Sequence, residues 1–138
     1  MTQVSEKYIQ VNDQNYISEH SADVRDLLKQ SYWAKDREIE KIRKSMENSM
    51  CFAIVDKEKD RIVAFARAIT DYATMYYLAD VIVDEQCRGM GLGKQIVNWI
   101  TQNESQLEGL YGLLLTKDAQ DLYAKYGFHD YENHCMRK

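Results

Sequence analysis

The 138-residue sequence predicts a single three-layer α/β/α domain, residues 1–138, with helices on both faces of a mixed sheet. Three observations predict this class. Apolar segments rich in β-branched residues alternate along the chain with segments of helical spacing. A charged turn at residues 56–60 separates two apolar segments, as in an antiparallel hairpin. Glycines within residues 88–94 join another apolar run to a helical pattern, and no linker or repeat divides the chain.

The first half of the chain predicts strands and two helices. Residues 12–15 are rich in turn-forming residues, and Ser21 and Asp36 are each placed to cap a helix. The strands are expected at residues 8–11, 51–55 and 61–70. The side chains expected to face the core are Val24, Leu27, Leu28 and Ser31 in the first helix and Ile39, Ile42 and Met46 in the second.

The second half predicts two more strands, two helices and a C-terminal edge. Residues 75–83 form the fourth strand, and the apolar residues 109–116 suit a buried, central fifth strand. Asp118 is placed to cap a short helix that Gly127 ends in a left-handed conformation. Residues 128–137 are expected to form one edge strand or a hairpin. The helix after the glycine turn presents Leu92, Ile96, Val97 and Ile100.

The composition argues against several classes of protein. The formal net charge is −4, so a broad nucleic-acid-binding surface is not expected. The first residues are polar, and no stretch approaches the roughly 18 apolar residues of a membrane span, so we expect a cytoplasmic protein. The three cysteines and three histidines lack metal-ligand spacing, so we expect no metal.

The turn at residues 88–94 has the features of an anion-binding loop. The first N–H groups of a helix have no partner within it and carry a partial positive charge. Gly89, Gly91 and Gly93 let several N–H groups approach one phosphate, and Arg88 and Lys94 add cationic donors. We therefore expect this turn to bind a phosphate or diphosphate group.

The spacing distinguishes three phosphate-binding signatures. A P-loop would need glycine in place of Arg88 and serine or threonine in place of Gln95, so it fails twice. The dinucleotide fingerprint fails once, because its sixth position counted from Gly89 is Lys94. The pattern Arg/Gln-x-x-Gly-x-Gly/Ala is met in full by residues 88–93, and also by residues 86–91.

That pattern resembles the loop with which the GNAT (GCN5-related) N-acetyltransferase superfamily holds the pyrophosphate of acetyl-CoA. Residues 122–128, Leu-Tyr-Ala-Lys-Tyr-Gly-Phe, resemble a second hallmark, Leu-Tyr-x-Lys-x-Gly-Phe. The resemblance implies a small, single-domain, bacterial-type enzyme that uses acetyl-CoA as cosubstrate. It also implies a mostly antiparallel sheet that splays between its fourth and fifth strands.

The resemblance further implies which residues form the site. Tyr123 would lie near the coenzyme sulfur as a general acid, and Tyr126, on the same helical face, would contact the coenzyme. Asp118 stands where the family often has asparagine, so it either contacts the coenzyme or only caps its helix. The other coenzyme-binding residues are Val81, Ile82 and Val83, through their backbone beside the pantetheine arm, and Arg88, Gly89, Met90, Gly91, Leu92, Gly93 and Lys94.

Acetyl transfer to an amine also needs a way to remove a proton. An alkylamine is only about 0.1% neutral at pH 7, so losing its proton costs about 4 kcal/mol. Asp80 lies between apolar residues, which would raise its pKa and suit a general base, acting directly or through water. Asp71, Glu85 or water alone are alternatives, and Asp80 could instead pair with Arg67 or another cation.

The acceptor and the assembly are the least defined. Asp71, Asp80 and Glu85 near the expected pocket favour a cationic amine, on a small molecule or on a protein. Tyr32 and Trp33 are either core aromatics or, as the resemblance implies, a wall of the acceptor pocket. A homodimer is possible. Two other functions stay open: a non-catalytic acyl-CoA-binding or sensor module, and a nucleotide-phosphate-binding protein outside the family.

Overall fold

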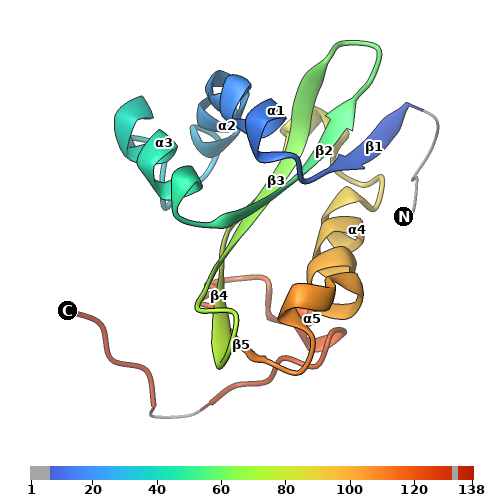
Figure 1. The fold of residues 1–138 in the computed structure, drawn as a ribbon. Helices are drawn as coiled ribbons and strands as arrows, with labels where there is room; N and C mark the ends of the chain where they lie inside the picture. Colours follow the sequence, from blue (N-terminus) through green and yellow to red (C-terminus); the bar gives the residue numbers. More distant parts are fainter. Residues whose placement is uncertain (1–6, 132–133) are drawn as a thin grey trace.

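A computed structural model describes residues 7–131 and 134–138 as one five-stranded sheet with helices on both faces (Figure 1). The strands follow one another in chain order across the sheet. Neighbours from β1 to β4 are antiparallel, and β4 and β5 are parallel. This confirms the predicted mixed, mostly antiparallel sheet. The strands are β1 (Tyr8–Val11), β2 (Met50–Asp56), β3 (Arg61–Thr70), β4 (Met75–Val83) and β5 (Tyr111–Leu113).

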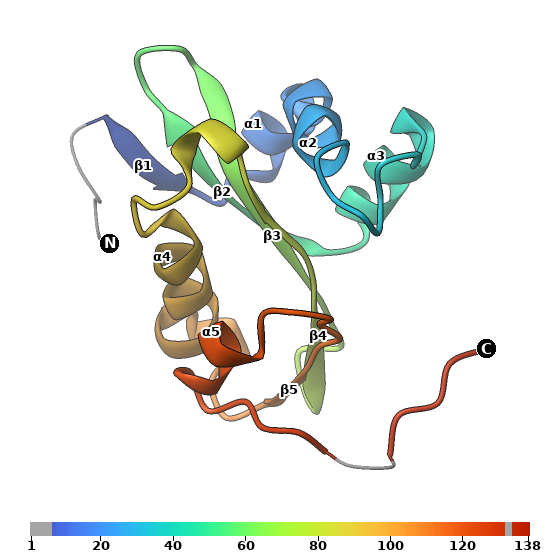
Figure 2. The same cartoon turned by 180° about the vertical axis from the view of Figure 1, so that it is seen from behind.

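The helices form two layers, one on each face of the sheet (Figures 1 and 2). The first layer contains α1 (Gln14–Glu19), α2 (Ser21–Leu28) and α3 (Ile39–Glu47). The second contains α4 (Leu92–Asn98), which continues as the π-helical turn η2 (Trp99–Asn103), and α5 (Gln120–Ala124). Within the described residues, no helix has both the length and the apolar character needed to cross a bilayer.

Each face of the sheet has its own apolar core. The side chains of β2 alternate between the two, as the pleat of a strand requires: Phe52 and Ile54 pack under α4, whereas Ala53 and Val55 pack under α2 and α3. This explains why β2 is buried almost throughout. The predicted inward faces of the first two helices are confirmed, because Val24, Leu27, Leu28, Ser31, Ile42 and Met46 are all buried and only Ile39 is partly exposed.

A β-bulge bends β4 in its second half. Phe65 of β3 lies opposite Ile82, but Arg67 lies opposite Ala79, so β4 contains one more residue than β3 between these pairs. Asp80 lies in the bulge with a φ of 54°. Aspartate is among the non-glycine residues that adopt this left-handed conformation most readily. The bulge therefore fixes the direction of the Asp80 side chain.

The sheet opens between β4 and β5. Parallel pairing runs only from Met75 opposite Tyr111 to Tyr77 opposite Leu113. Residues 78–83 of β4 thus have no strand partner on that side among the described residues. This confirms the predicted splay between the fourth and fifth strands.

Some helix starts differ from the prediction for local reasons. Residues 12–15, expected to be only a turn, lead into α1, because the Asp13 carboxylate accepts hydrogen bonds from the N–H groups of Asn15 and Tyr16 at 2.8 and 3.3 Å. Ser21 is the first residue of α2 rather than its cap. In α3, Glu38 is the cap in place of Asp36.

The last part of the chain departs most from the prediction. The fifth strand contains three residues instead of 109–116, and it is an edge strand whose Tyr111 and Leu113 are 62% and 42% exposed. Hydrophobicity alone did not reveal that only one side of this strand is paired. Residues 128–131 and 134–138 form no strand, contrary to the prediction for 128–137, in which residues 132–133 lie outside the described residues.

Candidate active site

The turn after β4 has the backbone of an open glycine loop. It passes through the 3-10 turn η1 (Glu85–Cys87) and reaches α4 with Gly89 and Gly91 both at a φ of 83°. Glycine adopts this conformation without strain. No atom lies within 4 Å of the point where either glycine would carry a Cβ. The outer side of the loop is therefore open to a ligand.

The polar groups of this loop are partly occupied. The Nε atom of Arg88 donates to the Val83 carbonyl at 3.3 Å, and Arg88 and Lys94 are both exposed. The Tyr126 hydroxyl donates to the Lys94 carbonyl at 3.2 Å, which links α5 to α4. Leu92 is buried and anchors the start of α4, whereas Met90 is 42% exposed. The cationic ends of the loop thus face outward.

Tyr123 lies on α5 with its ring in the core and its hydroxyl unpaired. The ring is buried and meets Phe128 edge to face, with 6.0 Å between ring centroids. Burial, with a smaller contribution from the nearby Tyr32, raises the pKa of Tyr123 to about 12. Its hydroxyl makes no hydrogen bond with any described residue. A protonated, unpaired hydroxyl can donate to a ligand.

Asp80 is held by three donors. Its Oδ2 atom accepts from Arg67 Nε at 2.7 Å and from Arg37 Nη1 at 2.8 Å. Its Oδ1 atom accepts from the Trp33 indole N–H at 3.1 Å. Arg67 and Ser49 are also linked, because Arg67 Nη1 donates to the Ser49 hydroxyl at 3.1 Å. The bulge of β4 is thereby tied to β3 and to the segment between α2 and α3.

The pKa of Asp80 is shifted in the direction opposite to the one that suits a general base. Burial by itself raises the pKa of Asp80, but the hydrogen bonds and charges of Arg67 and Arg37 outweigh it, and the pKa is lowered. The prediction that the pKa of Asp80 is raised is therefore wrong. The alternative, that Asp80 forms an ion pair with Arg67, is what the structure contains. A carboxylate of lowered pKa is a weak base for an ammonium group.

The other acidic candidates do not form a cationic-amine pocket. Asp71 lies in the exposed turn between β3 and β4, where the N–H groups of Thr74 and Ala73 and the Thr74 hydroxyl lower its pKa. Glu85 is exposed in η1. Asp118 is exposed and does not cap α5: Ala119 is the cap residue, and the Thr116 hydroxyl accepts its N–H at 3.0 Å.

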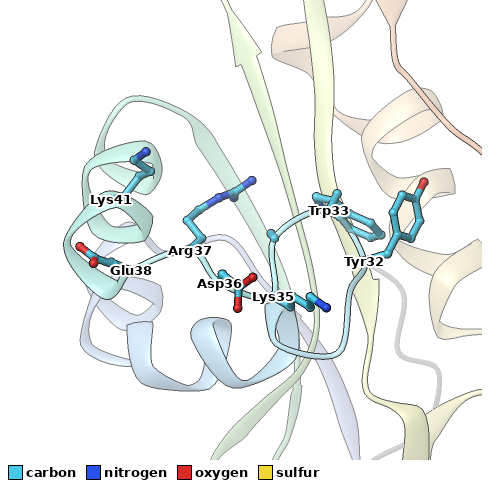
Figure 3. Close-up of a pocket in the computed structure, with 8 residues that line it drawn as sticks. Tyr32, Trp33, Lys35, Asp36, Arg37, Glu38 and Lys41 are labelled. Carbon is cyan, nitrogen blue, oxygen red and sulfur yellow. The ribbon is translucent and has the colours of Figure 1, made fainter.

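A cavity of about 540 Å³ lies along the segment between α2 and α3, and two of its lining residues, Trp33 and Arg37, are the ones that bond to Asp80 (Figure 3). It is lined by residues 32–38 and by Lys41. In Figure 3 the aromatic side chains of Tyr32 and Trp33 lie at one end of this segment, and Glu38 and Lys41 lie at the other. Tyr32 is 57% and Trp33 is 43% exposed, so they are not core residues.

Sequence reasoning missed two residues of this region. Arg37 contacts an aspartate 43 positions away, and Lys117 places its ammonium 5.3 Å from the centre of the Tyr32 ring. The only available signal for Arg37 was that a carboxylate amid apolar residues needs a cation. In the described part of the chain, no group of acidic, histidine or cysteine side chains could hold a metal ion.

Most of the chain matches a model of a known protein family. A family model described as an acetyltransferase (GNAT) domain matches residues 47–130. The chain belongs to the GNAT acetyltransferase family. The resemblance predicted from residues 88–93 and 122–128 is thereby confirmed, and a nucleotide-binding protein outside the family is excluded.

Individual GNAT relatives agree in fold. A crystal structure of a Xanthomonas campestris protein assigned to the GNAT family has a TM-score of 0.85 and 32% identity, over 95% of this chain and 92% of that one. An "uncharacterized N-acetyltransferase ycf52" of Pyropia yezoensis is 30% identical over 100 residues, which are 70% of this chain. The match covers only 57% of the length of that relative. The fold is also shared with an aminoglycoside 6'-N-acetyltransferase that was crystallised with coenzyme A. That structure is 23% identical with a TM-score of 0.57, and the match covers 68% of this chain and 53% of that one.

Proposed function

We propose that this GNAT-family chain transfers an acetyl group from acetyl-CoA to a primary amine. One observation supports this most directly: residues 78–83 of β4, which have no described strand partner on their β5 side, lead through η1 into the open glycine loop at 88–94. An extended ligand can form hydrogen bonds with the backbone of residues 78–83, and its diphosphate can accept hydrogen bonds from the N–H groups of the glycine loop. A similar fold has been crystallised with coenzyme A, which supports the choice of ligand.

In this proposal the backbone of Val81, Ile82 and Val83 pairs with the pantetheine arm. The residues from Arg88 to Lys94 hold the diphosphate. The acceptor nitrogen attacks the thioester carbon, forming a C–N bond, and backbone N–H groups of β4 stabilise the oxyanion. The C–S bond then breaks and its electron pair leaves on sulfur.

Tyr123 donates a hydrogen bond to the departing sulfur in this proposal. With a pKa of about 12 the hydroxyl stays protonated at neutral pH. A thiol has a pKa near 8.5, so complete transfer from tyrosine would be uphill by about 3.5 units, or about 5 kcal/mol. Tyr123 therefore acts mainly as a hydrogen-bond donor to the developing thiolate, and solvent completes the protonation. The unpaired state of its hydroxyl supports this role.

The amine proton leaves through water in this account. The lowered pKa of Asp80 makes direct abstraction by its carboxylate too unfavourable to help. We assign Asp80 a positioning role instead, because it ties the segment that carries Tyr32 and Trp33 to β4.

The competing function is a non-catalytic acyl-CoA-binding module. Release of free thiol from acetyl-CoA, followed with a panel of amines, separates the two. The proposal expects thiol release that depends on both enzyme and amine. Binding of acetyl-CoA without amine-dependent release would favour the module.

We also propose a homodimer formed through the edge of β5. Three exposed apolar side chains lie along this edge and just beyond it: Tyr111, Leu113 and Leu115, which are 62%, 42% and 58% exposed. Exposed apolar edge strands tend to pair with another chain. Bacterial origin and a cytoplasmic location stay predictions from the sequence.

A further inference from the structure

The acceptor side of the site has an excess of positive charge, although the whole chain has a formal net charge of −4. The cavity lined by Trp33 and Arg37 carries three cationic side chains, Lys35, Arg37 and Lys41, against two carboxylates, Asp36 and Glu38. Asp80 adds no free negative charge, because two guanidinium groups share its Oδ2 atom. The charge argument for a cationic acceptor therefore fails.

Arg37 has hydrogen-bonding capacity left over. Only its Nη1 atom contacts Asp80, and its Nε and Nη2 atoms bond to no described residue. The side chain is 20% exposed, so these N–H groups can be reached. A guanidinium group binds a carboxylate or phosphate through such pairs of N–H groups.

An aromatic surface connects this arginine to Tyr123. Trp33 shares the Asp80 carboxylate with Arg37, and Tyr32 meets Trp33 edge to face, with 5.1 Å between ring centroids. Tyr32 in turn lies near enough to Tyr123 to influence its pKa. A small molecule lying across the two exposed rings would reach from Arg37 toward Tyr123.

We infer that the acetyl acceptor is a small amine that also carries an anionic group, a carboxylate or a phosphate, and that Arg37 binds that group. Tyr32 and Trp33 support the body of the molecule, and its amine points toward the β4 bulge. The inference rests on the proposed acetyl transfer and specifies its substrate class.

Matched acceptor pairs test the inference. L-Tyrosine against tyramine and phosphoethanolamine against ethanolamine differ by one anionic group, and thiol release gives kcat/KM for each. We expect the anionic member to be favoured at least tenfold. In Arg37→Gln this preference should fall below threefold, and the ratio between the two members is the readout, because removing one guanidinium partner of Asp80 also lowers activity with both members. General damage to the fold would instead lower both members equally.

Two further variants complete the design. Lys41→Gln, which leaves the Asp80 contacts intact, should lower the preference about threefold, and Lys57→Gln, in the distant β2–β3 turn, should leave it unchanged. Equal use of both members by the wild type, or a preference that survives Arg37→Gln, would overturn the inference.

A binding experiment without acetyl transfer tests this inference separately from the proposed reaction. The same four amines are titrated into the protein saturated with CoA and followed by calorimetry. Tenfold tighter binding of the anionic members, lost in Arg37→Gln, supports the inference even if no thiol is released. Equal binding of both members overturns it, whereas absent thiol release alone would refute only the proposed transfer.

Discussion

The Nη1 atom of Arg37 lies 2.8 Å from the Oδ2 atom of Asp80, so the segment between α2 and α3 is tied to the bulge of β4. Both partners are largely shielded from water, with side-chain exposures of 20% and 4%. Arg67 meets the same oxygen from β3 at 2.7 Å. One carboxylate thus links three parts of the chain: the segment between α2 and α3, strand β3 and the bulge of β4.

Asp80→Asn should destabilise the fold and spare the shape of the pH profile. Asparagine tolerates the positive φ at this position, but it leaves two partly buried arginines without their counter-charge. We expect a loss of about 3 kcal/mol in unfolding free energy, measured by urea denaturation. If Asp80 were the general base, the variant would instead lose the pH dependence of kcat/KM while keeping most of its stability.

The effect of Asp80 on stability should disappear in acid. Its folded pKa is lowered, so its contribution is present above the unfolded pKa near 3.8 and is lost as pH falls through the folded value. We expect the difference in unfolding free energy between wild type and Asp80→Asn to be full at pH 7 and to shrink below about pH 4. A difference that stays constant down to pH 2 would show that the ion pairs are not its source.

Tyr123→Phe should lower turnover more than coenzyme affinity. The variant keeps the buried ring and removes only the unpaired hydroxyl. We expect kcat to fall about 10- to 100-fold, since thiolate is already a good leaving group, with the Kd for acetyl-CoA changed less than threefold. Tyr126→Phe, two residues beyond the end of α5, is the control and should keep kcat within threefold. Unchanged kcat in Tyr123→Phe would remove this residue from the mechanism.

Arg88→Ala should weaken coenzyme binding. The side chain is exposed at the start of the glycine loop and keeps N–H groups free beside its contact with Val83. Losing one charge-assisted contact should raise the Kd for acetyl-CoA about tenfold, or about 1.4 kcal/mol. Thermal shift by acetyl-CoA measures this, with Lys57→Ala as a matched loss of a distant cation. Equal shifts in the two variants would argue against a phosphate contact.

Leu113→Lys should disrupt the proposed dimer. A lysine on an edge strand opposes pairing with a second chain. Sedimentation velocity should give twice the chain mass for the wild type and the single-chain mass for the variant. A monomeric wild type at micromolar concentration would refute the dimer.

Regular elements were predictable from sequence where the pattern was local. The bounds of β1, β3 and β4 agree with the predicted residues 8–11, 61–70 and 75–83, because each strand is flanked by turn residues. The splay of the sheet came from family resemblance, since no local pattern records which strands separate.

The errors share a non-local origin. Leu113 is exposed because no strand formed by residues 7–131 or 134–138 lies beyond β5, and the sequence of β5 itself does not encode this. The pKa of Asp80 is lowered first by Arg67, on the neighbouring strand β3, and further by Arg37, which lies 43 positions earlier in the chain. Sequence alone therefore predicted the conformation of the glycine turn better than the surroundings of Asp80.

Calorimetric titration of the wild-type chain with acetyl-CoA tests the central claim most directly, with ATP as the matched phosphate ligand. The account predicts saturable binding of one acetyl-CoA per chain and no heat of binding with ATP. Absence of binding by acetyl-CoA, or equal binding of both ligands, would contradict it.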